Sequence, residues 1–175
     1  MPKNAPQRYS AMTTDGWELA LYRYSPERGV APDQSPVFLC HGLGANRYNL
    51  DAPGHMSFAR YISDQGFDTW VVELRGAGKS SRPSLFNQFK YDWTFDDYVH
   101  RDTPAAIEKV LQVTGADKVH WVGHSMGGMI AYAYLMTHGD DRVRSMTTVG
   151  SPALAHAPHR VLKKVLPLRH LLRKL

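Results

Sequence analysis

One stretch, residues 118–136, constrains the fold of this chain more than any other. It reads KVHWVGHSMGGMIAYAYLM. A short apolar run at 119–122 predicts a strand, which leads directly into Gly-His-Ser-Met-Gly at 123–127. The residues that follow are apolar almost all round, and a helix without a polar face is a buried helix. The predicted order is therefore strand, sharp turn with Ser125 at its tip, and buried helix.

The spacing G-x-S-x-G at such a turn is typical of a nucleophile elbow. A serine hydroxyl is a weak nucleophile unless it is exposed, beside a base and near donors for the oxyanion. A tight turn lifts Ser125 out of the sheet and holds its backbone in a strained conformation. Gly123, Gly127 and Gly128 lack a Cβ and leave room for the turn to pass close to its neighbours. The alternative interpretation is an ordinary Gly-Ser turn ahead of a core helix.

Length and composition are those of a soluble globular protein. A chain of 175 residues can bury about 70% of its unfolded surface. Apolar residues make up 43% and charged residues 21%, which is ordinary. The single cysteine, Cys40, excludes an internal disulfide. Residues 1–16 contain no secretory signal and no apolar run reaches the length of a membrane span, so we expect a cytoplasmic protein.

The net charge of +5 is unevenly distributed. From Arg142 to the end there are eight Lys or Arg residues and no Asp or Glu. Removing those eight from 21 leaves 13 basic against 16 acidic residues, so the body of the chain carries −3. A basic tail invites a nucleic-acid interpretation, but no recognition motif accompanies it, and we expect no nucleic-acid partner.

The rest of the chain alternates between strand and helix patterns. A hairpin at 9–24 turns at Asp15-Gly16, a dipeptide that favours a tight turn. A second long helical pattern begins at Thr94, with Asp97 completing a capping box. Pro104 is expected to divide that helix, with Thr103 capping the second segment. The other predicted elements are strands at 37–40, 69–74 and 143–149 and a helix at 57–65. Alternation after a hairpin predicts an α/β fold with a mostly parallel sheet and helices on both faces.

Three motifs in register resemble the α/β-hydrolase superfamily, and most closely its lipase- and esterase-like members. They are HGLG at 41–44, RGAGKSSRP at 75–83 and GHSMGG at 123–128, and the resemblance covers roughly residues 9–153. The resemblance implies that Ser125 is the nucleophile and that the backbone N–H groups of Leu43 and Met126 form the oxyanion hole. We expect structural roles for the glycines and histidines of the elbow and of the HGLG loop. The glycines leave room for the turns and the histidines shape them: Gly42, Gly44, Gly123, Gly127, Gly128, His41 and His124.

Other candidate sites are weaker. GKS at 78–80 ends like a phosphate-binding loop, but Glu73 stands where the first glycine is required. The glycines of the HGLG loop lack the third glycine of a dinucleotide fingerprint, since Arg47 occupies its place. His120 and His124 have a helical metal spacing but fall on a strand and a turn. We therefore expect no cofactor and no metal.

The partners that a serine elbow needs do not follow it in the expected way. In the family the chain order is serine, then acid, then histidine. Asp140 and Asp141 are the only acids after Ser125, at the start of the last strand rather than its catalytic end. His156 and His159 follow that strand, but we interpret their segment as the entry into a larger structural unit. We therefore expect the acid and the histidine beyond the 175 residues.

We accordingly interpret 1–153 as the N-terminal portion of an α/β-hydrolase core that lacks the last strands, and 154–175 as the truncated start of a cap or lid. The tail has an apolar face at helical spacing with basic residues between. It is alternatively a solvated terminal helix, or a segment that contacts a membrane surface weakly through 159–175.

The predicted function is a serine hydrolase that cleaves carboxylic esters through an acyl-enzyme, of lipase, lysophospholipase or esterase type. The expected partner is a small-molecule ester or lipid substrate. Two alternatives stay open. One is a non-catalytic protein that uses the same fold to bind a ligand or partner, and the other is an acyltransferase, perhydrolase or carbon–carbon hydrolase.

Overall fold

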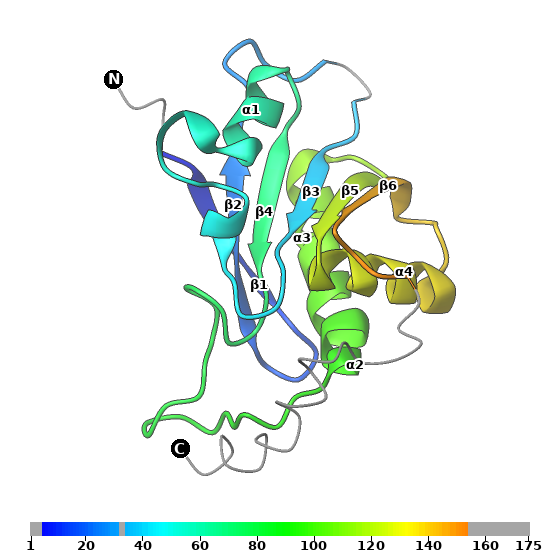
Figure 1. Cartoon of the computed structure of the whole chain (residues 1–175). Coiled ribbons are helices and arrows are strands. Elements are labelled where there is room, and N and C mark those ends of the chain that lie inside the picture. Colours follow the sequence, from blue (N-terminus) through cyan, green and yellow to red (C-terminus); the bar gives the residue numbers. More distant parts are fainter. Residues whose placement is uncertain (1–4, 32–33, 154–175) are drawn as a thin grey trace.

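The computed structural model describes residues 5–31 and 34–153, which form a twisted six-stranded sheet with helices on both faces (Figure 1). The sheet order is β1-β2-β4-β3-β5-β6. β2 is antiparallel to both of its neighbours, β1 and β4, whereas β4, β3, β5 and β6 are all parallel. The predicted α/β fold with a mostly parallel sheet is confirmed. The strands are β1 (Gln7–Met12), β2 (Glu18–Tyr24), β3 (Val37–Cys40), β4 (Thr69–Glu73), β5 (Val119–His124) and β6 (Val143–Val149).

The strands lie where the sequence predicts them, because their cause is local. β3 and β4 are short, mostly apolar runs that are buried on both faces, whereas β5 alternates between buried and half-buried residues. The hairpin closes at Asp15-Gly16, where Gly16 adopts a φ of 84° that a side chain would disfavour. The predicted start of a cap at 154–175, with His156 and His159, lies outside the described residues.

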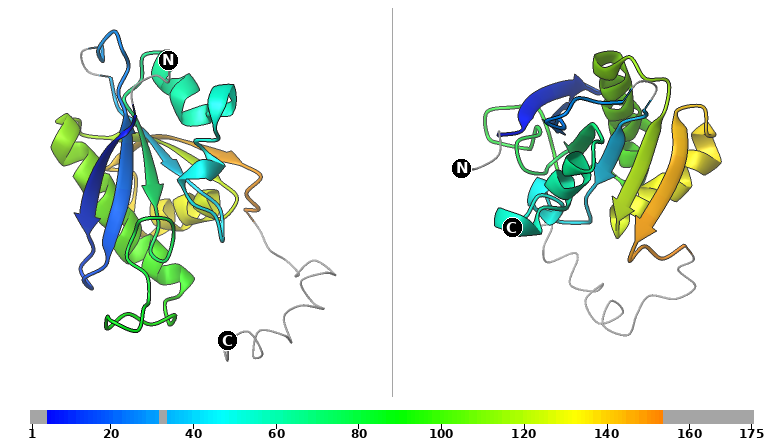
Figure 2. Two further views of the ribbon diagram at one scale, coloured as in Figure 1. Left: turned by 90° about the vertical axis from the view of Figure 1, so that its left-hand side faces the viewer. Right: turned by 90° about the horizontal axis from the view of Figure 1, so that it is seen from above.

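Helices cover the two faces unequally (Figure 2). One face carries α1 (Phe58–Asp64), which packs on β2 and β4. The other carries α3 (Thr103–Thr114) and α4 (Met126–His138). Two single 3₁₀ turns, η1 (Arg47–Asn49) and η2 (Gly54–Met56), lead into α1. None of the helices in the described ranges is long and apolar enough to cross a membrane.

The predicted break at Pro104 is wrong, because the helix continues through it. After α2 (Phe95–Asp97) with its capping box at Thr94, a single π-helical turn, η3 (Tyr98–Asp102), connects directly to α3. Thr103 is therefore no cap: its backbone N–H and its hydroxyl both donate to the carbonyl of Tyr98, five residues back. The wider π turn leaves room for the proline ring and does not require the hydrogen bond that proline cannot donate. The helix therefore continues without a break.

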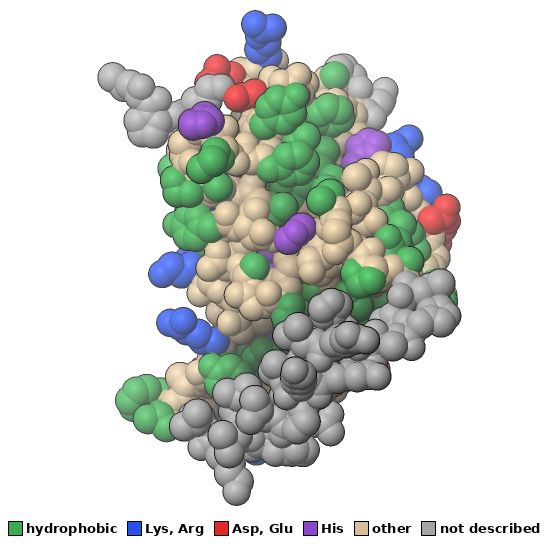
Figure 3. Space-filling model, viewed as in Figure 1, with side chains coloured by type: hydrophobic (Ala, Val, Ile, Leu, Met, Phe, Trp, Pro, Cys, Tyr) green, Lys and Arg blue, Asp and Glu red, His purple; other side chains and the backbone are tan. Residues whose placement is uncertain are grey.

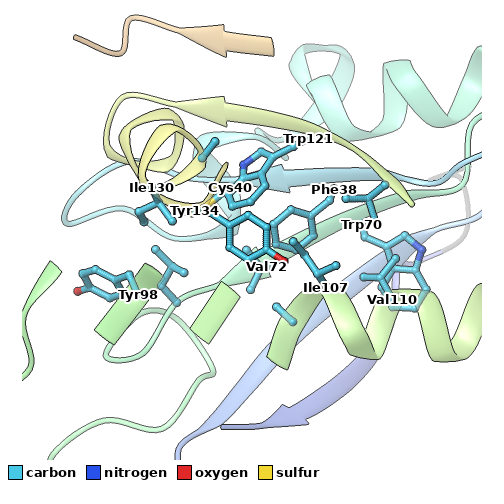
Figure 4. Close-up of a cluster of buried hydrophobic side chains, with 14 of the residues drawn as sticks. Phe38, Cys40, Trp70, Val72, Tyr98, Ile107, Val110, Trp121, Ile130 and Tyr134 are labelled. Atoms are coloured by element: carbon cyan, nitrogen blue, oxygen red, sulfur yellow. The ribbon is translucent and has the colours of Figure 1, made fainter. Parts of the chain in front are cut away.

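The main core lies between the sheet and the pair α3 and α4 (Figure 4). Trp70 and Trp121 are its largest fully buried side chains, and Phe38 meets Trp121 edge-to-face with ring centroids 5.3 Å apart. The helix predicted to be buried is buried or half-buried from Met126 to Leu135, and Ile130 is wholly inaccessible. Only its last turn is exposed, beginning at Met136. The core therefore fixes α4, and with it the turn at its start, against the centre of the sheet.

Candidate active site

The turn between β5 and α4 holds Ser125 in an unusual backbone conformation. Its φ is 51° and its ψ is −117°. Among the described residues it is the one non-glycine residue with a positive φ. Such a conformation costs about 1–3 kcal/mol and persists only where surrounding structure imposes it. β5, which ends one residue earlier, and α4, which begins one residue later, impose it here.

The glycines of the turn are pressed against backbone. A Cβ on Gly127 would lie 2.7 Å from the carbonyl carbon of Cys40, at the end of β3. A Cβ on Gly123 would lie 2.5 Å from the backbone of Gly127, and one on Gly128 would collide with Ser151. These are distances that real Cβ atoms do not adopt. The predicted close approach of the elbow to its neighbours is therefore present in the structure.

The HGLG loop lies directly against this turn. A Cβ built on Gly42 would stand 3.2 Å from the Cβ of Ser125. The side chain of Leu43, the next residue, is 76% exposed, so it does not fill the space beside the serine. The fold thus brings together two motifs that are more than 80 positions apart in the sequence.

Two backbone donors beside Ser125 are uncommitted. The carbonyl of Ser125 accepts the N–H groups of Gly128 and Met129, as at the start of any helix. Within the part of the chain that the structure describes, the N–H groups of Leu43 and Met126 make no hydrogen bond. The N–H of Met126 is also the first of α4, where the helix dipole is positive. The arrangement suits a developing negative charge.

His41 has a structural place in this loop. It is 2% exposed, its Nε2 accepts the N–H of Leu74 at 3.2 Å, and its Nδ1 lies 2.8 Å from the carbonyl oxygen of Gly42. Because Nε2 accepts, the proton must be on Nδ1, which donates to Gly42. Burial lowers the pKa of His41 and favours this neutral form. Both ring nitrogens are occupied, so His41 ties the loop to the end of β4.

Asn49 joins the two motifs and was not anticipated from the sequence. Its Oδ1 lies 2.8 Å from Nδ1 of His124 and accepts the N–H of Gly42 at 3.3 Å. A lone asparagine in a one-turn helix carries no motif, so only the folded chain reveals it. Through this shared oxygen, Asn49 joins His124 of the elbow to Gly42 of the HGLG loop.

The RGAGKSSRP loop encloses a carboxylate of its own chain. Glu73 accepts the N–H of Lys79 at 2.7 Å and that of Arg47 at 3.2 Å. Gly78 passes so close that a Cβ there would collide with the Glu73 carboxyl group. The backbone donors of this loop are thus bound to a carboxylate of the same chain.

The described residues supply no base for Ser125. No side chain in these ranges hydrogen-bonds to its hydroxyl. Asp140 and Asp141 precede β6 at the end of the sheet opposite Ser125. Burial raises the pKa of the Cys40 thiol, so this cysteine is no alternative nucleophile. The described ranges also contain no group of three or more side chains suited to holding a metal ion.

Comparison with known proteins agrees with this geometry. The family model of the α/β hydrolase fold matches residues 35–171, which is most of the chain. The chain belongs to the α/β-hydrolase fold family. Several of the curated proteins to which the chain is similar are lipases. Triacylglycerol lipase 2 of Arabidopsis thaliana is 32% identical over 161 residues, covering 86% of this chain and 38% of the relative.

Animal lipases give a similar picture. Lysosomal acid lipase/cholesteryl ester hydrolase of Homo sapiens is 32% identical over 139 residues, which is 74% of this α/β-hydrolase chain and 35% of the relative. Gastric triacylglycerol lipase of Mus musculus is 31% identical over 140 residues, again 35% of its own length. The chain therefore spans little more than a third of the curated relatives it matches.

Solved structures share the fold. An esterase from Exiguobacterium antarcticum superposes with a TM-score of 0.59 at 25% identity, covering 84% of this chain and 46% of that one. A bacterial membrane phospholipase A superposes with a TM-score of 0.66 at 22% identity, covering 93% of this chain and 45% of that one. At this identity the second match shows the α/β-hydrolase fold alone.

Proposed function

We propose that this protein is a serine hydrolase of carboxylic esters, of lipase or esterase type, with Ser125 as its nucleophile. The observation that carries the proposal is the backbone of Ser125, strained at the junction of β5 and α4 with the HGLG loop pressed against it. A chain has no packing reason to hold a serine in that conformation. The lipases among its relatives supply the reaction class.

The proposed reaction proceeds through an acyl-enzyme. The hydroxyl oxygen of Ser125 attacks the ester carbonyl carbon, and its proton passes to a base. The resulting oxyanion accepts the free N–H groups of Leu43 and Met126, each worth about 3 kcal/mol of transition-state stabilisation. Collapse of this intermediate breaks the bond to the alcohol, which leaves with the proton. Water then hydrolyses the acyl group and restores Ser125.

The base and its orienting acid belong to the proposal as well. We propose a histidine and an acid contributed from outside the described residues, at the carboxyl end of the sheet where Ser125 lies. His41 is not a candidate, because both of its ring nitrogens are hydrogen-bonded, and we assign His124 the structural role of binding Asn49. Acyl lipids are the proposed substrates, by analogy with the triacylglycerols and cholesteryl esters in the names of the relatives.

The test is chemical labelling of the protein expressed from its whole reading frame. A fluorophosphonate probe should label the wild type and not Ser125→Ala, and hydrolysis of a short p-nitrophenyl ester should be lost in parallel. Ser10→Ala, at an exposed serine of β1, is the control and should label normally. Labelling that survives Ser125→Ala would reject the nucleophile. A wild type that is folded but neither labels nor turns over ester would favour the ligand-binding alternative.

The fate of the acyl group separates the remaining alternatives. Hydrolases, acyltransferases and perhydrolases share the acyl-enzyme and differ in the nucleophile that resolves it. Adding an alcohol or hydrogen peroxide to the ester assay should therefore leave the carboxylic acid as the main product. A dominant transfer product would move the assignment to one of the other two classes.

A further inference from the structure

The loop at 81–93 exposes two large apolar side chains at its end. Leu85 and Phe86, here called the apolar tip, are each 98% exposed, and Tyr91 nearby is 73% exposed. In Figure 1 the loop extends well away from the sheet, and the same view in Figure 3 shows a hydrophobic group projecting there. Single exposed apolar residues are ordinary. An adjacent pair with almost no contact to the rest of the chain indicates an interaction surface.

The apolar tip is held in a formed turn. The Asn87 side chain accepts the N–H of Ser84 at 3.2 Å and donates to the carbonyl of Arg82 at 3.0 Å. The hydroxyl of Ser84 accepts the N–H of Phe86 at 3.2 Å. Because polar side chains satisfy the backbone here, the turn is complete without a partner. What it lacks is cover for its two apolar side chains.

Aromatic stacking anchors the base of the loop. Phe89 packs on Trp17 with ring centroids 4.2 Å apart, and Trp17 meets Trp93 edge-on at 5.3 Å. Trp93 in turn donates its indole N–H to the hydroxyl of Tyr98, at the start of η3. The base of the loop is thereby connected to the hairpin and to the helix.

The segment that carries the apolar tip has a net positive charge. Residues 79–93 include three exposed cations, Lys79, Arg82 and Lys90, against one acid, Asp92. Figure 3 shows Lys and Arg side chains along the edge of the molecule from which the loop projects. Apolar side chains that project beyond cations are the pattern of segments that insert at an anionic lipid surface. An apolar pocket on a protein would need no such flanking charge.

The loop also projects from the same end of the sheet as Ser125. β4 and β5 are parallel to β3 on either side of it. The loop follows the carboxyl end of β4, and Ser125 follows the carboxyl end of β5. A surface that received the apolar tip would therefore face the end of the fold that carries the elbow.

We propose that the apolar tip inserts into an anionic lipid surface and holds the elbow end of the protein towards it. Insertion buries Leu85 and Phe86 in the acyl boundary, while Arg82 and Lys90 contact acidic headgroups. The role of this orientation rests on the proposed ester hydrolysis, because it brings Ser125 to lipid esters. Binding itself does not depend on Ser125.

The experiment is sedimentation with vesicles, using the protein expressed from its whole reading frame. Vesicles of phosphatidylcholine alone are compared with vesicles that contain phosphatidylserine. The double variant Leu85→Ser/Phe86→Ser should bind the anionic vesicles at least about tenfold more weakly, because two large apolar side chains are lost from the interface. Met136→Ser, at another highly exposed apolar residue on α4, is the matched control and should bind as the wild type does.

The charges are tested separately. Arg82→Gln and Lys90→Gln should each weaken binding to the anionic vesicles by about fivefold and leave binding to pure phosphatidylcholine unchanged. Wild-type binding should also weaken as salt is added, since exposed charges are screened. Charge variants that lower binding equally to both kinds of vesicle would contradict the role of the cations.

Insertion is measured with an environment-sensitive dye on Leu85→Cys, compared with the unsubstituted protein treated with the same dye; Cys40, the cysteine of the described residues, is buried. Its emission should shift to the blue with anionic vesicles, whereas a dye on Met136→Cys should not respond. Unchanged vesicle binding by Leu85→Ser/Phe86→Ser, or a dye at 85 that stays in water, would overturn the proposal. Self-association that the double variant abolishes in the absence of lipid would instead identify a second copy as the occupant.

The outcome for Ser125→Ala separates this proposal from the proposed function. That variant should bind vesicles as the wild type does while hydrolysing no ester. If the protein binds vesicles through Leu85 and Phe86 but has no esterase activity, the lipid-binding proposal stands and the proposed function is rejected. If the protein hydrolyses a soluble ester fully but does not bind vesicles, the proposed function stands and the lipid-binding proposal is rejected.

Discussion

The guanidinium of Arg75 and the carboxylate of Asp102 form a buried ion pair, with Nε of Arg75 2.7 Å from Oδ1 of Asp102. The backbone N–H of Arg75 donates to the same carboxylate at 2.9 Å. The two terminal N–H₂ groups of the guanidinium donate to Asp15, in the turn of the hairpin. One cation therefore connects the hairpin, the end of β4 and the helix at η3.

Removing the carboxylate of Asp102 should destabilise the fold strongly. Asp102→Ala leaves Arg75 charged, buried and only half compensated, and we expect it to lower the free energy of unfolding by about 3–5 kcal/mol. Urea unfolding followed by circular dichroism measures this. Asp92→Ala, at an exposed acid, should change stability by no more than about 0.5 kcal/mol. Equal effects of the two variants would show that the buried ion pair contributes no more to stability than an exposed acid does.

Gly127→Val should prevent a stable elbow. Its Cβ would lie 2.7 Å from the carbonyl carbon of Cys40 and 2.8 Å from the carbonyl oxygen of His41, neither of which can move without distorting β3. We expect loss of activity together with a large fall in melting temperature. Thr137→Val, a β-branched side chain on the exposed last turn of the same helix, is the control. A Gly127→Val protein with the wild-type melting temperature would show that the turn is not crowded there.

Ser125→Gly should be more stable than Ser125→Ala, although both are inactive. Glycine adopts the φ of 51° without the penalty that alanine retains. The strain removed is about 1–3 kcal/mol, and the extra freedom of glycine in the unfolded chain offsets about 0.5–1 kcal/mol of it. Thermal unfolding of the two variants under identical conditions gives the comparison. An alanine variant as stable as the glycine variant would mean that the turn stores no strain.

His41 should make stability fall at acid pH. Burial places its folded-state pKa below the ordinary value of about 6.5, so the folded protein resists protonation there. Its contribution is complete above pH 6.5 and is lost as the pH falls from 6.5 through the folded pKa. Protonation also removes the acceptor for the N–H of Leu74. The melting temperature of His41→Gln should therefore depend less on pH in this window.

The exposed His55 is the control for that experiment. His55→Gln, at an exposed position, should retain the full pH dependence of the wild type. If His41→Gln and the wild type showed parallel curves between pH 6.5 and 5, the acid sensitivity would come from another group.

Sequence by itself determined the order of strands and helices and the place of the elbow. Strand and helix periodicities are local properties of neighbouring residues. The need for glycine around Ser125 is equally local, because β5 and α4 follow one another directly in the chain. These features were predicted with boundaries that agree to within a few residues.

Tertiary structure alone decided which side chains pair. Arg75 and Asp102 are 27 positions apart and Asn49 and His124 are 75 apart, so no spacing rule connects them. The continuous helix through Pro104 depends likewise on a π turn, in which the carbonyl of Tyr98 accepts from Thr103. A polar side chain has several possible partners along the sequence, and only the packing of the sheet and its helices selects one. The conformation at Ser125 was encoded locally, but the contacts that hold the HGLG loop against it arise only when the chain has folded.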